Sequence, residues 1–256
     1  MRQMTVWVVV VLCLAASSEA RAQGDRQPPA PIDFPSADFL FGPPHATVGF
    51  RGNWLFARAG SDWFSFVTSQ LSVDKQDFNA PGFAADVGIP LGRRTEAVIG
   101  VDFNQTTTAS DYRDFVDNNR LPITQTTRLR TTSLTGSVKY ALVARGLEVS
   151  RLAWVPRHVV PYVGAGGGAL HYDLQQYGDF IDFADNSVFA STFKSAGWAP
   201  VAQAFGGVDV RVLKRVYVTL DARYQWSNAT LDTTWVDFDP IDLAGFKLAA
   251  GATFLF

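Results

Sequence analysis

Apolar and polar side chains alternate with a period of two along most of this chain after residue 46. In the segment 216–226 every even-numbered residue is apolar, whereas the odd-numbered residues carry hydroxyl, carboxylate, guanidinium or amide groups. Successive side chains of a β-strand point to opposite faces, so this segment is predicted to be a strand with one apolar and one polar face. The segment 246–256 repeats the pattern, with Phe246, Phe254 and Phe256 on the apolar face.

Further segments with the same alternation bring the predicted strands to eight. Each is long enough to supply the roughly 9–11 tilted residues that a strand needs to cross a membrane. No segment after the N-terminus offers the roughly 18 consecutive apolar residues of a helical membrane span. Charged residues make up only 18% of the chain, which suits strands with one face in lipid. The six further strands are predicted at 46–58, 83–91, 95–106, 127–143, 159–174 and 198–212.

The predicted connections alternate between short and long. Short turns on one side and long loops on the other are typical of an outer-membrane barrel with both termini in the periplasm. We therefore predict an all-β fold, an eight-stranded antiparallel up-and-down transmembrane β-barrel formed by residues 46–256. A soluble lipocalin-like barrel is the alternative. The short connections are 92–94, 213–215 and, at medium length, 144–158, and the long ones are 59–82, 107–126, 175–197 and 227–242.

The first 22 residues have the features of a Sec signal peptide. Arg2 supplies a positive start, a short apolar run follows, and Ala20-Arg21-Ala22 forms a small-residue cleavage site. Cleavage after Ala22 would remove Cys13, the only cysteine of the chain. Residues 23–45, which are rich in proline, are predicted to form a periplasmic tail.

Three motifs in the second half of the chain resemble those of the OmpA/OmpW-type outer-membrane β-barrel family. The run 161–172, PYVGAGGGALHY, is similar to the PYxGxGxG strand of that family, and 207–224 is similar to its penultimate hairpin. The terminal GATFLF, with Gly251, Phe254 and Phe256, resembles the signal read by the barrel-assembly machinery, and the chain departs from that signal at Ala249. The resemblance implies a closed barrel in the Gram-negative outer membrane, in contact with its lipid. It does not imply one activity, because such barrels include anchors, structural proteins and narrow transporters.

The lumen of this barrel is predicted to hold nearly balanced charge. Eight strands leave an interior that side chains can fill, and buried charges need partners. We therefore expect an interlocked network that plugs the lumen. The alternation places these side chains inside: Arg51, Asp86, Glu96, Asp102, Lys139, Asp173, Asp209, Arg211, Asp221, Arg223 and Lys247.

The long connections contain many aromatic residues as well as many aspartates. Large aromatic side chains are costly to leave in water, so they are expected to fold over the mouth of the barrel or to line an entrance for a small hydrophobic compound. Residues 61–71 are predicted either as a short amphipathic helix or as an extension of the first hairpin. The candidate entrance aromatics are Trp63, Phe64, Phe66, Phe180, Phe183 and Trp235.

These features give three functional hypotheses. The leading one is a non-enzymatic outer-membrane barrel with a structural or surface-interaction role. The second is an OmpW-like passive carrier of small hydrophobic compounds. The third is a lipid-modifying enzyme that uses His171, which is expected to point into the lumen near Asp173. For the leading hypothesis we expect a monomer with no cofactor, no bound metal and no nucleic-acid partner.

Overall fold

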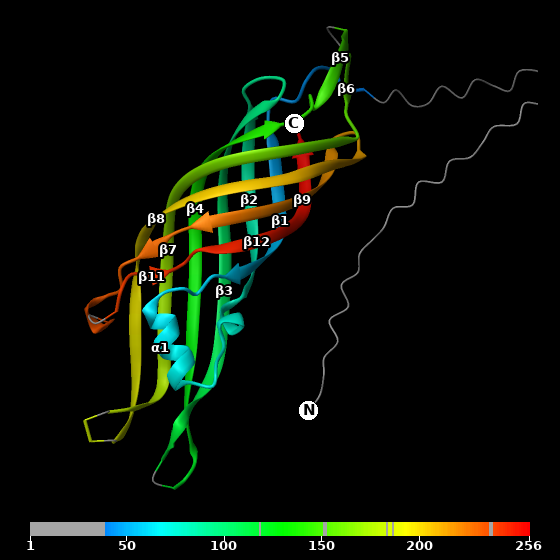
Figure 1. Ribbon diagram of the computed structural model, residues 1–256. Helices are drawn as coiled ribbons and strands as arrows, with labels where there is room; N and C mark the ends of the chain where they lie inside the picture. Colours follow the sequence, from blue (N-terminus) through cyan, green and yellow to red (C-terminus); the bar gives the residue numbers. More distant parts are fainter. Residues whose placement is uncertain (1–38, 118, 151–152, 183, 186, 236–237) are drawn as a thin grey trace, which may run out of the picture. The chain divides into compact units, whose positions relative to one another are not determined.

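In the computed structural model, which describes residues 39–256 except 118, 151–152, 183, 186 and 236–237, eight antiparallel strands close into a barrel. Strands that follow each other along the chain pair side by side, and the first and last strands pair to close the ring (Figure 1). The predicted eight-stranded up-and-down barrel is confirmed. Its strands are β1 (Thr47–Ala57), β2 (Ala80–Pro90), β3 (Thr95–Val116), β4 (Pro122–Ala141), β7 (Val159–Ile181), β8 (Val188–Leu213), β9 (Val216–Trp226) and β12 (Gly245–Leu255).

Shorter elements occupy the connections. Helix α1 (Asp62–Gln70) lies between β1 and β2, which decides the alternatives for residues 61–71 in favour of a helix. The predicted signal peptide and most of the predicted proline-rich tail lie outside the described residues. The remaining short elements are η1 (Lys75–Phe78), β5 (Gly146–Ser150), β6 (Ala153–Pro156), β10 (Asn228–Ala229), η2 (Thr233–Trp235) and β11 (Ile241–Asp242).

The terminal strand β12 closes the barrel over its whole length. Its register against β1 runs without a shift from Thr47 opposite Leu255 to Ala57 opposite Gly245. Beyond the strand, the Phe256 carbonyl accepts a hydrogen bond from the His45 N–H at 2.7 Å. A closed ring leaves no unpaired strand edge in lipid, where an unsatisfied backbone group would cost several kcal/mol.

Three strands, β3, β7 and β8, are much longer than predicted, and β4 begins five residues earlier than predicted. β3, β4, β7 and β8 have 22, 20, 23 and 26 residues, whereas the other barrel strands have 11 each. The prediction that 107–126 and 175–197 are loops is therefore wrong, because most of both segments continues the β3–β4 and β7–β8 hairpins. Figure 1 shows these four strands running past the ends of β1 and β12, with α1 against the extension.

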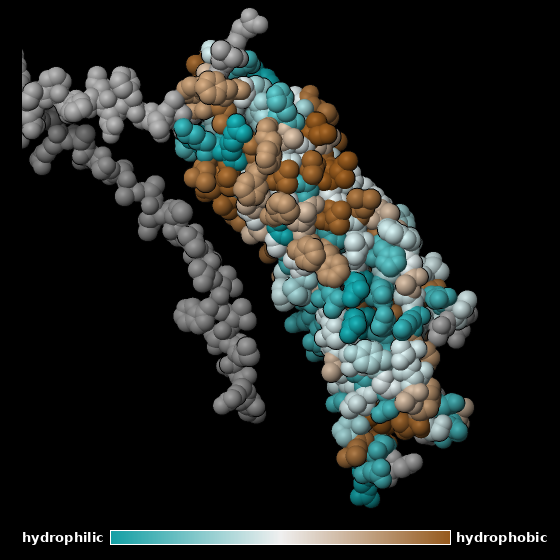
Figure 2. All heavy atoms as spheres, turned by 180° about the vertical axis from the view of Figure 1, so that it is seen from behind, coloured by the Kyte–Doolittle hydropathy of each residue, from teal (hydrophilic) through white to brown (hydrophobic). Residues whose placement is uncertain are grey.

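The outer surface divides into an apolar part and a polar part along the strands. Figure 2 shows brown, hydrophobic residues concentrated in the upper half of this face, and mostly hydrophilic residues below them with a smaller brown patch near the lower end. On β4 the outward residues change from Leu134, Val138 and Tyr140 to Arg130 and Arg128 in the extension. The apolar part has the composition of a lipid-facing belt, and the extension leaves the membrane on the side of the long connections. None of the described helices is long and apolar enough to cross a membrane.

The inner face of the extension is mixed, with buried polar residues such as Gln125 and Gln176 beside apolar ones, and α1 packs against the apolar ones. Trp63, Phe64 and Val67 of α1 are buried in one cluster with Leu170 and Leu174 of β7. Trp63 and Phe78 pack edge to face, with ring centroids 6.0 Å apart. Burial of an aromatic side chain stabilises by about 1.5–3 kcal/mol, so this cluster fixes α1 inside the curve of the extended strands.

Candidate functional site

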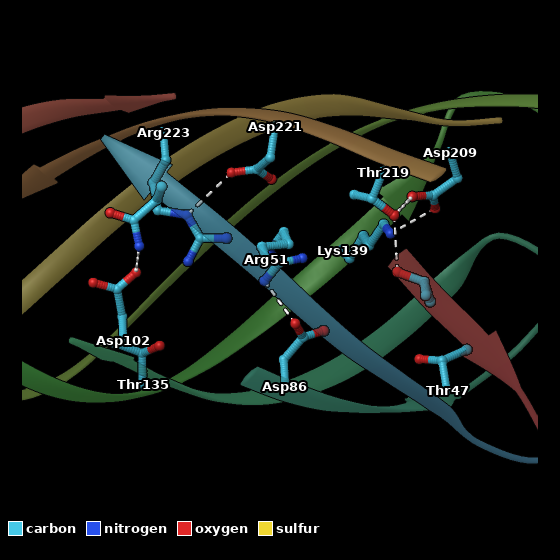
Figure 3. Close-up of polar contacts among 12 residues, drawn as sticks. Thr47, Arg51, Asp86, Asp102, Thr135, Lys139, Asp209, Thr219, Asp221 and Arg223 are labelled. Atoms are coloured by element: carbon cyan, nitrogen blue, oxygen red, sulfur yellow. Dashed lines mark hydrogen bonds and ion pairs between the residues drawn. The ribbon is translucent and has the colours of Figure 1, made fainter. Parts of the chain in front are cut away.

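Five ion pairs lie inside the barrel, and in each of them one basic side chain is paired with one acidic side chain. Four of the basic residues belong to the barrel strands, whereas Arg145 reaches in from the connection after β4. Figure 3 shows several of these charged groups pointing toward one another across the interior. The five pairs are Arg51–Asp86 (2.7 Å), Lys139–Asp209 (2.7 Å), Arg223–Asp221 (3.3 Å), Arg145–Glu96 and Lys247–Asp102.

Neutral side chains complete the hydrogen bonding of these carboxylates. The Thr219 hydroxyl donates to Asp209 at 2.8 Å and the Tyr162 hydroxyl donates to Asp221 at 3.0 Å. The Thr47 hydroxyl donates to Glu96 at 2.6 Å. Hydrogen bonds of this kind satisfy the lone pairs that would otherwise make a buried carboxylate costly.

The space left between these side chains is small. One cavity lies between Arg51, Asp86 and Tyr162, and another lies around Glu96 and Arg145; each has a volume of about 20 Å³. A cavity of this size holds about one water molecule. The described lumen therefore contains water-sized gaps between charged side chains.

The structure places most of the predicted lumen residues inside the barrel, with two exceptions. Asp173 alternates with Tyr172 and Leu174, which are buried inside, so Asp173 faces outward and its predicted lumen position is wrong. Arg211 lies at the short-turn end, where its guanidinium contacts the His158 ring at 2.8 Å. The sequence prediction also missed Arg145, which is not on a strand and so has no place in an alternating pattern.

His171 also faces outward, contrary to the predicted lumen position. It lies opposite Trp198 of β8, and the two rings are 5.1 Å apart. Trp198 is 69% exposed, on the lipid-facing side of the barrel. Among the residues that the structure describes, no three His, Cys, Asp or Glu side chains gather as metal ligands.

The extended strands and α1 line a separate, partly open pocket of about 160 Å³, which is mostly aromatic and aliphatic but includes three glutamines. Its aromatic residues pack on one another: the Phe180 and Phe193 ring centroids are 4.6 Å apart, and those of Phe193 and Trp235 are 5.8 Å apart. A cavity of about 150 Å³ with apolar walls accommodates a benzene-sized molecule. The lining residues are Phe66, Val67, Gln70, Leu71, Tyr112, Gln125, Gln176, Phe180, Ile181, Phe189, Phe193 and Trp235.

The candidate entrance aromatics fall into two groups. Phe66, Phe180 and Trp235 line the pocket, whereas Trp63 and Phe64 are buried in the cluster beneath α1. Phe183 lies outside the described residues.

The pocket also contains Tyr112, which the sequence prediction did not include. Tyr112 lies in the part of β3 beyond the apolar belt, and burial raises the pKa of its hydroxyl even though hydrogen bonds from Ile181 and Gln125 lower it. The hydroxyl is therefore neutral at physiological pH, and the pocket presents no charged side chain.

The residues of the predicted assembly signal all lie on or beside β12. Phe254 and Phe256 are exposed on its outer side. Gly251 lies where β12 passes close to β1, and a Cβ atom there would overlap the Phe50 carbonyl oxygen. Packing in the closed barrel thus gives a reason for glycine at this position, apart from any role in targeting.

Comparison with known proteins finds a limited likeness to solved outer-membrane barrels. Neisserial surface protein A is 13% identical with a TM-score of 0.47, and the match covers 84% of this chain and 99% of that chain. The N-terminal β-barrel domain of Pseudomonas aeruginosa OprF is 13% identical with a TM-score of 0.35, covering 84% and 100%. Outer membrane protein AlkL is 16% identical with a TM-score of 0.32, covering 91% and 96%. No protein-family model and no curated protein matches the sequence.

Proposed function

We propose that this chain is a non-enzymatic outer-membrane barrel with a structural or surface-interaction role, and that its lumen does not conduct. The observation that carries the proposal is the one-to-one pairing of charges in the lumen. Breaking a buried ion pair by removing one partner costs about 3–5 kcal/mol. A pore through this lumen requires several ion pairs to separate at the same time. The summed free-energy cost is too large for thermal motion to keep the lumen open.

The extracellular part supports a surface role. Beyond the apolar belt, β3, β4, β7 and β8 continue as a four-stranded sheet, and α1 packs against the inner face of this sheet. A packed extension of this kind gives a fixed surface above the membrane. The outward position of His171 beside Trp198 supports the non-enzymatic part of the proposal.

Planar-bilayer recording of the purified protein tests the closed lumen. We expect no steady conductance from the wild-type chain. A variant in which Arg51, Asp86, Asp221 and Arg223 are all alanine removes four of the five charged groups around one cavity and leaves Lys139; it should conduct. The matched control, Arg58→Ala with Asp242→Ala, removes an ion pair in the connections outside the lumen and should remain closed. Heat-modifiable gel mobility checks that each variant has folded, and steady wild-type conductance would contradict the proposal.

The aromatic pocket favours a second candidate function, the binding and passive transfer of a small hydrophobic compound. Its volume of about 160 Å³ and its uncharged lining support this candidate. The pocket is separate from the charged lumen, so binding there does not require the ion pairs of the lumen to separate.

Substitution of Phe193 tests this second candidate. Phe193→Ser removes the ring that contacts both Phe180 and Trp235, and we expect at least a tenfold weaker binding of naphthalene, measured by its fluorescence. The control Trp198→Ser removes an aromatic ring from the outer face of the same strand and should bind naphthalene as the wild type does. Equal binding by both variants, or no binding by the wild type, would exclude the candidate.

A further inference from the structure

A groove of about 520 Å³ lies at the short-turn end of the barrel. One wall is the segment 43–45 that leads into β1, a second is the β2–β3 turn, and the third is the start of β5 with Trp154 of β6. In outer-membrane barrels the short turns face the periplasm. This groove therefore lies at the level of the periplasmic leaflet.

Backbone and side-chain contacts fix the shape of the groove. Leu40 and Trp154 exchange two backbone hydrogen bonds of 2.8 and 3.0 Å, which attach the segment before β1 to β6 through an isolated antiparallel bridge. The Trp154 indole packs on Gly146, where a Cβ atom would overlap the ring. Trp154 is only 6% exposed and lines the groove.

The groove is continuous with the lipid-facing belt. Ile89 lies on the outer face of β2, in line with Val87, and Leu91 follows in the turn; these residues are 54%, 49% and 65% exposed, respectively. Pro43 and Pro44 form the opposite apolar wall. An acyl chain lying along β2 would thus lead directly into the groove.

Two exposed charges of opposite sign stand at the groove. Arg93 and Glu148 both line it, and neither takes part in an ion pair among the described residues. Arg145 also lines the groove, but its guanidinium is bound to Glu96. A ligand therefore meets one available cation and one available anion rather than a basic patch.

We propose that this groove binds the headgroup of a zwitterionic phospholipid that carries a primary ammonium group, a phosphoethanolamine lipid. The phosphate contacts Arg93, since guanidinium groups bind phosphate oxygens through two parallel hydrogen bonds. The ammonium contacts Glu148, and the glycerol and the first methylene groups lie against Leu91 and Ile89. The site does not depend on whether the lumen conducts, so it goes beyond the function proposed above.

Lipid retention during native mass spectrometry tests this site. The full-length protein is equilibrated in mild detergent with equal amounts of phosphatidylethanolamine and phosphatidylglycerol. We expect one phosphatidylethanolamine to be retained in at least fivefold excess over phosphatidylglycerol. Arg93→Ala and Glu148→Ala should each reduce that excess at least threefold.

Arg215→Ala is the matched control, because Arg215 is an exposed arginine of the other short turn and does not line the groove. It should retain phosphatidylethanolamine as the wild type does. Equal retention by all variants, absence of a retained lipid, or preference for phosphatidylglycerol would each overturn the proposal. Preference for phosphatidylglycerol would mean that arginine alone selects the lipid.

Discussion

At the scale of single residues, Glu96 is one of the most deeply buried carboxylates of the lumen. Its side chain is bound by the Arg145 guanidinium and by the Thr47 hydroxyl, and the residue is 1% exposed. Glu96→Gln keeps the shape of the side chain but leaves Arg145 without its charge partner. We expect the free energy of unfolding to fall by about 3–5 kcal/mol, measured by urea unfolding in detergent micelles.

Two further variants separate the ion pair from a general effect of losing a carboxylate. Glu148→Gln changes an exposed carboxylate near the same end of the barrel and should alter stability by less than about 0.5 kcal/mol. The double variant Glu96→Gln with Arg145→Gln should recover part of the loss, because no charge is then left buried and unpaired. A Glu96→Gln protein as stable as the wild type would show that the pair adds nothing.

The direction in which a strand side chain points, toward the lumen or toward lipid, could be predicted wherever one face of the strand is polar and the other is apolar. In 216–226 and 246–256 the polar face is the lumen face, and the predicted orientation agrees with the structure. In 159–174 the inner face carries Tyr162, Leu170 and Tyr172, and the outer face carries small residues before His171. Both faces are therefore apolar, and the alternation cannot tell which one faces lipid. The inverted positions of Asp173 and His171 follow from this ambiguity.

At the scale of elements, the existence and order of the strands could be predicted, but the ends of the longest ones could not. The outward residues of β3 are apolar up to Phe103 and mostly polar from Gln105 onward, which removes the signal of a lipid-facing strand. The strand nevertheless continues to Val116, since its backbone pairs with β4 and its edge is bonded by the segment after α1. Pairing with distant segments is invisible to a local pattern.

The small elements show the same limit. Helix α1 is nine residues long, and such a helix is marginal in water by itself. It is stabilised by burial of Trp63, Phe64 and Val67 against strands that are far away in the sequence. For the same reason the sequence predicts only a group of aromatic residues and not the pocket itself. The volume of the pocket depends on where α1 packs against the strands.

At the scale of the whole molecule, two features predict the orientation of the barrel in the membrane. They are the lengths of the connections and the position of the apolar belt. The extension of β3, β4, β7 and β8 should be extracellular, and the short turns should be periplasmic. Asp114 is exposed near the tip of the β3–β4 hairpin, and Arg94 is exposed in the β2–β3 turn at the opposite end. The only cysteine is Cys13 of the predicted signal peptide, so single cysteines introduced at these positions can be labelled selectively.

We expect Asp114→Cys to react in intact cells with a maleimide too large to cross the outer membrane. Arg94→Cys should stay unlabelled until the outer membrane is permeabilised, because the lipid belt lies between the reagent and the short turns. Both substitutions lie on the surface, so neither should disturb folding, and labelling of both after detergent extraction serves as the control. Labelling of Arg94→Cys but not Asp114→Cys in intact cells would reverse the orientation. It would also move the proposed phospholipid groove to the outer leaflet, which makes this measurement a test of the whole arrangement rather than of one loop.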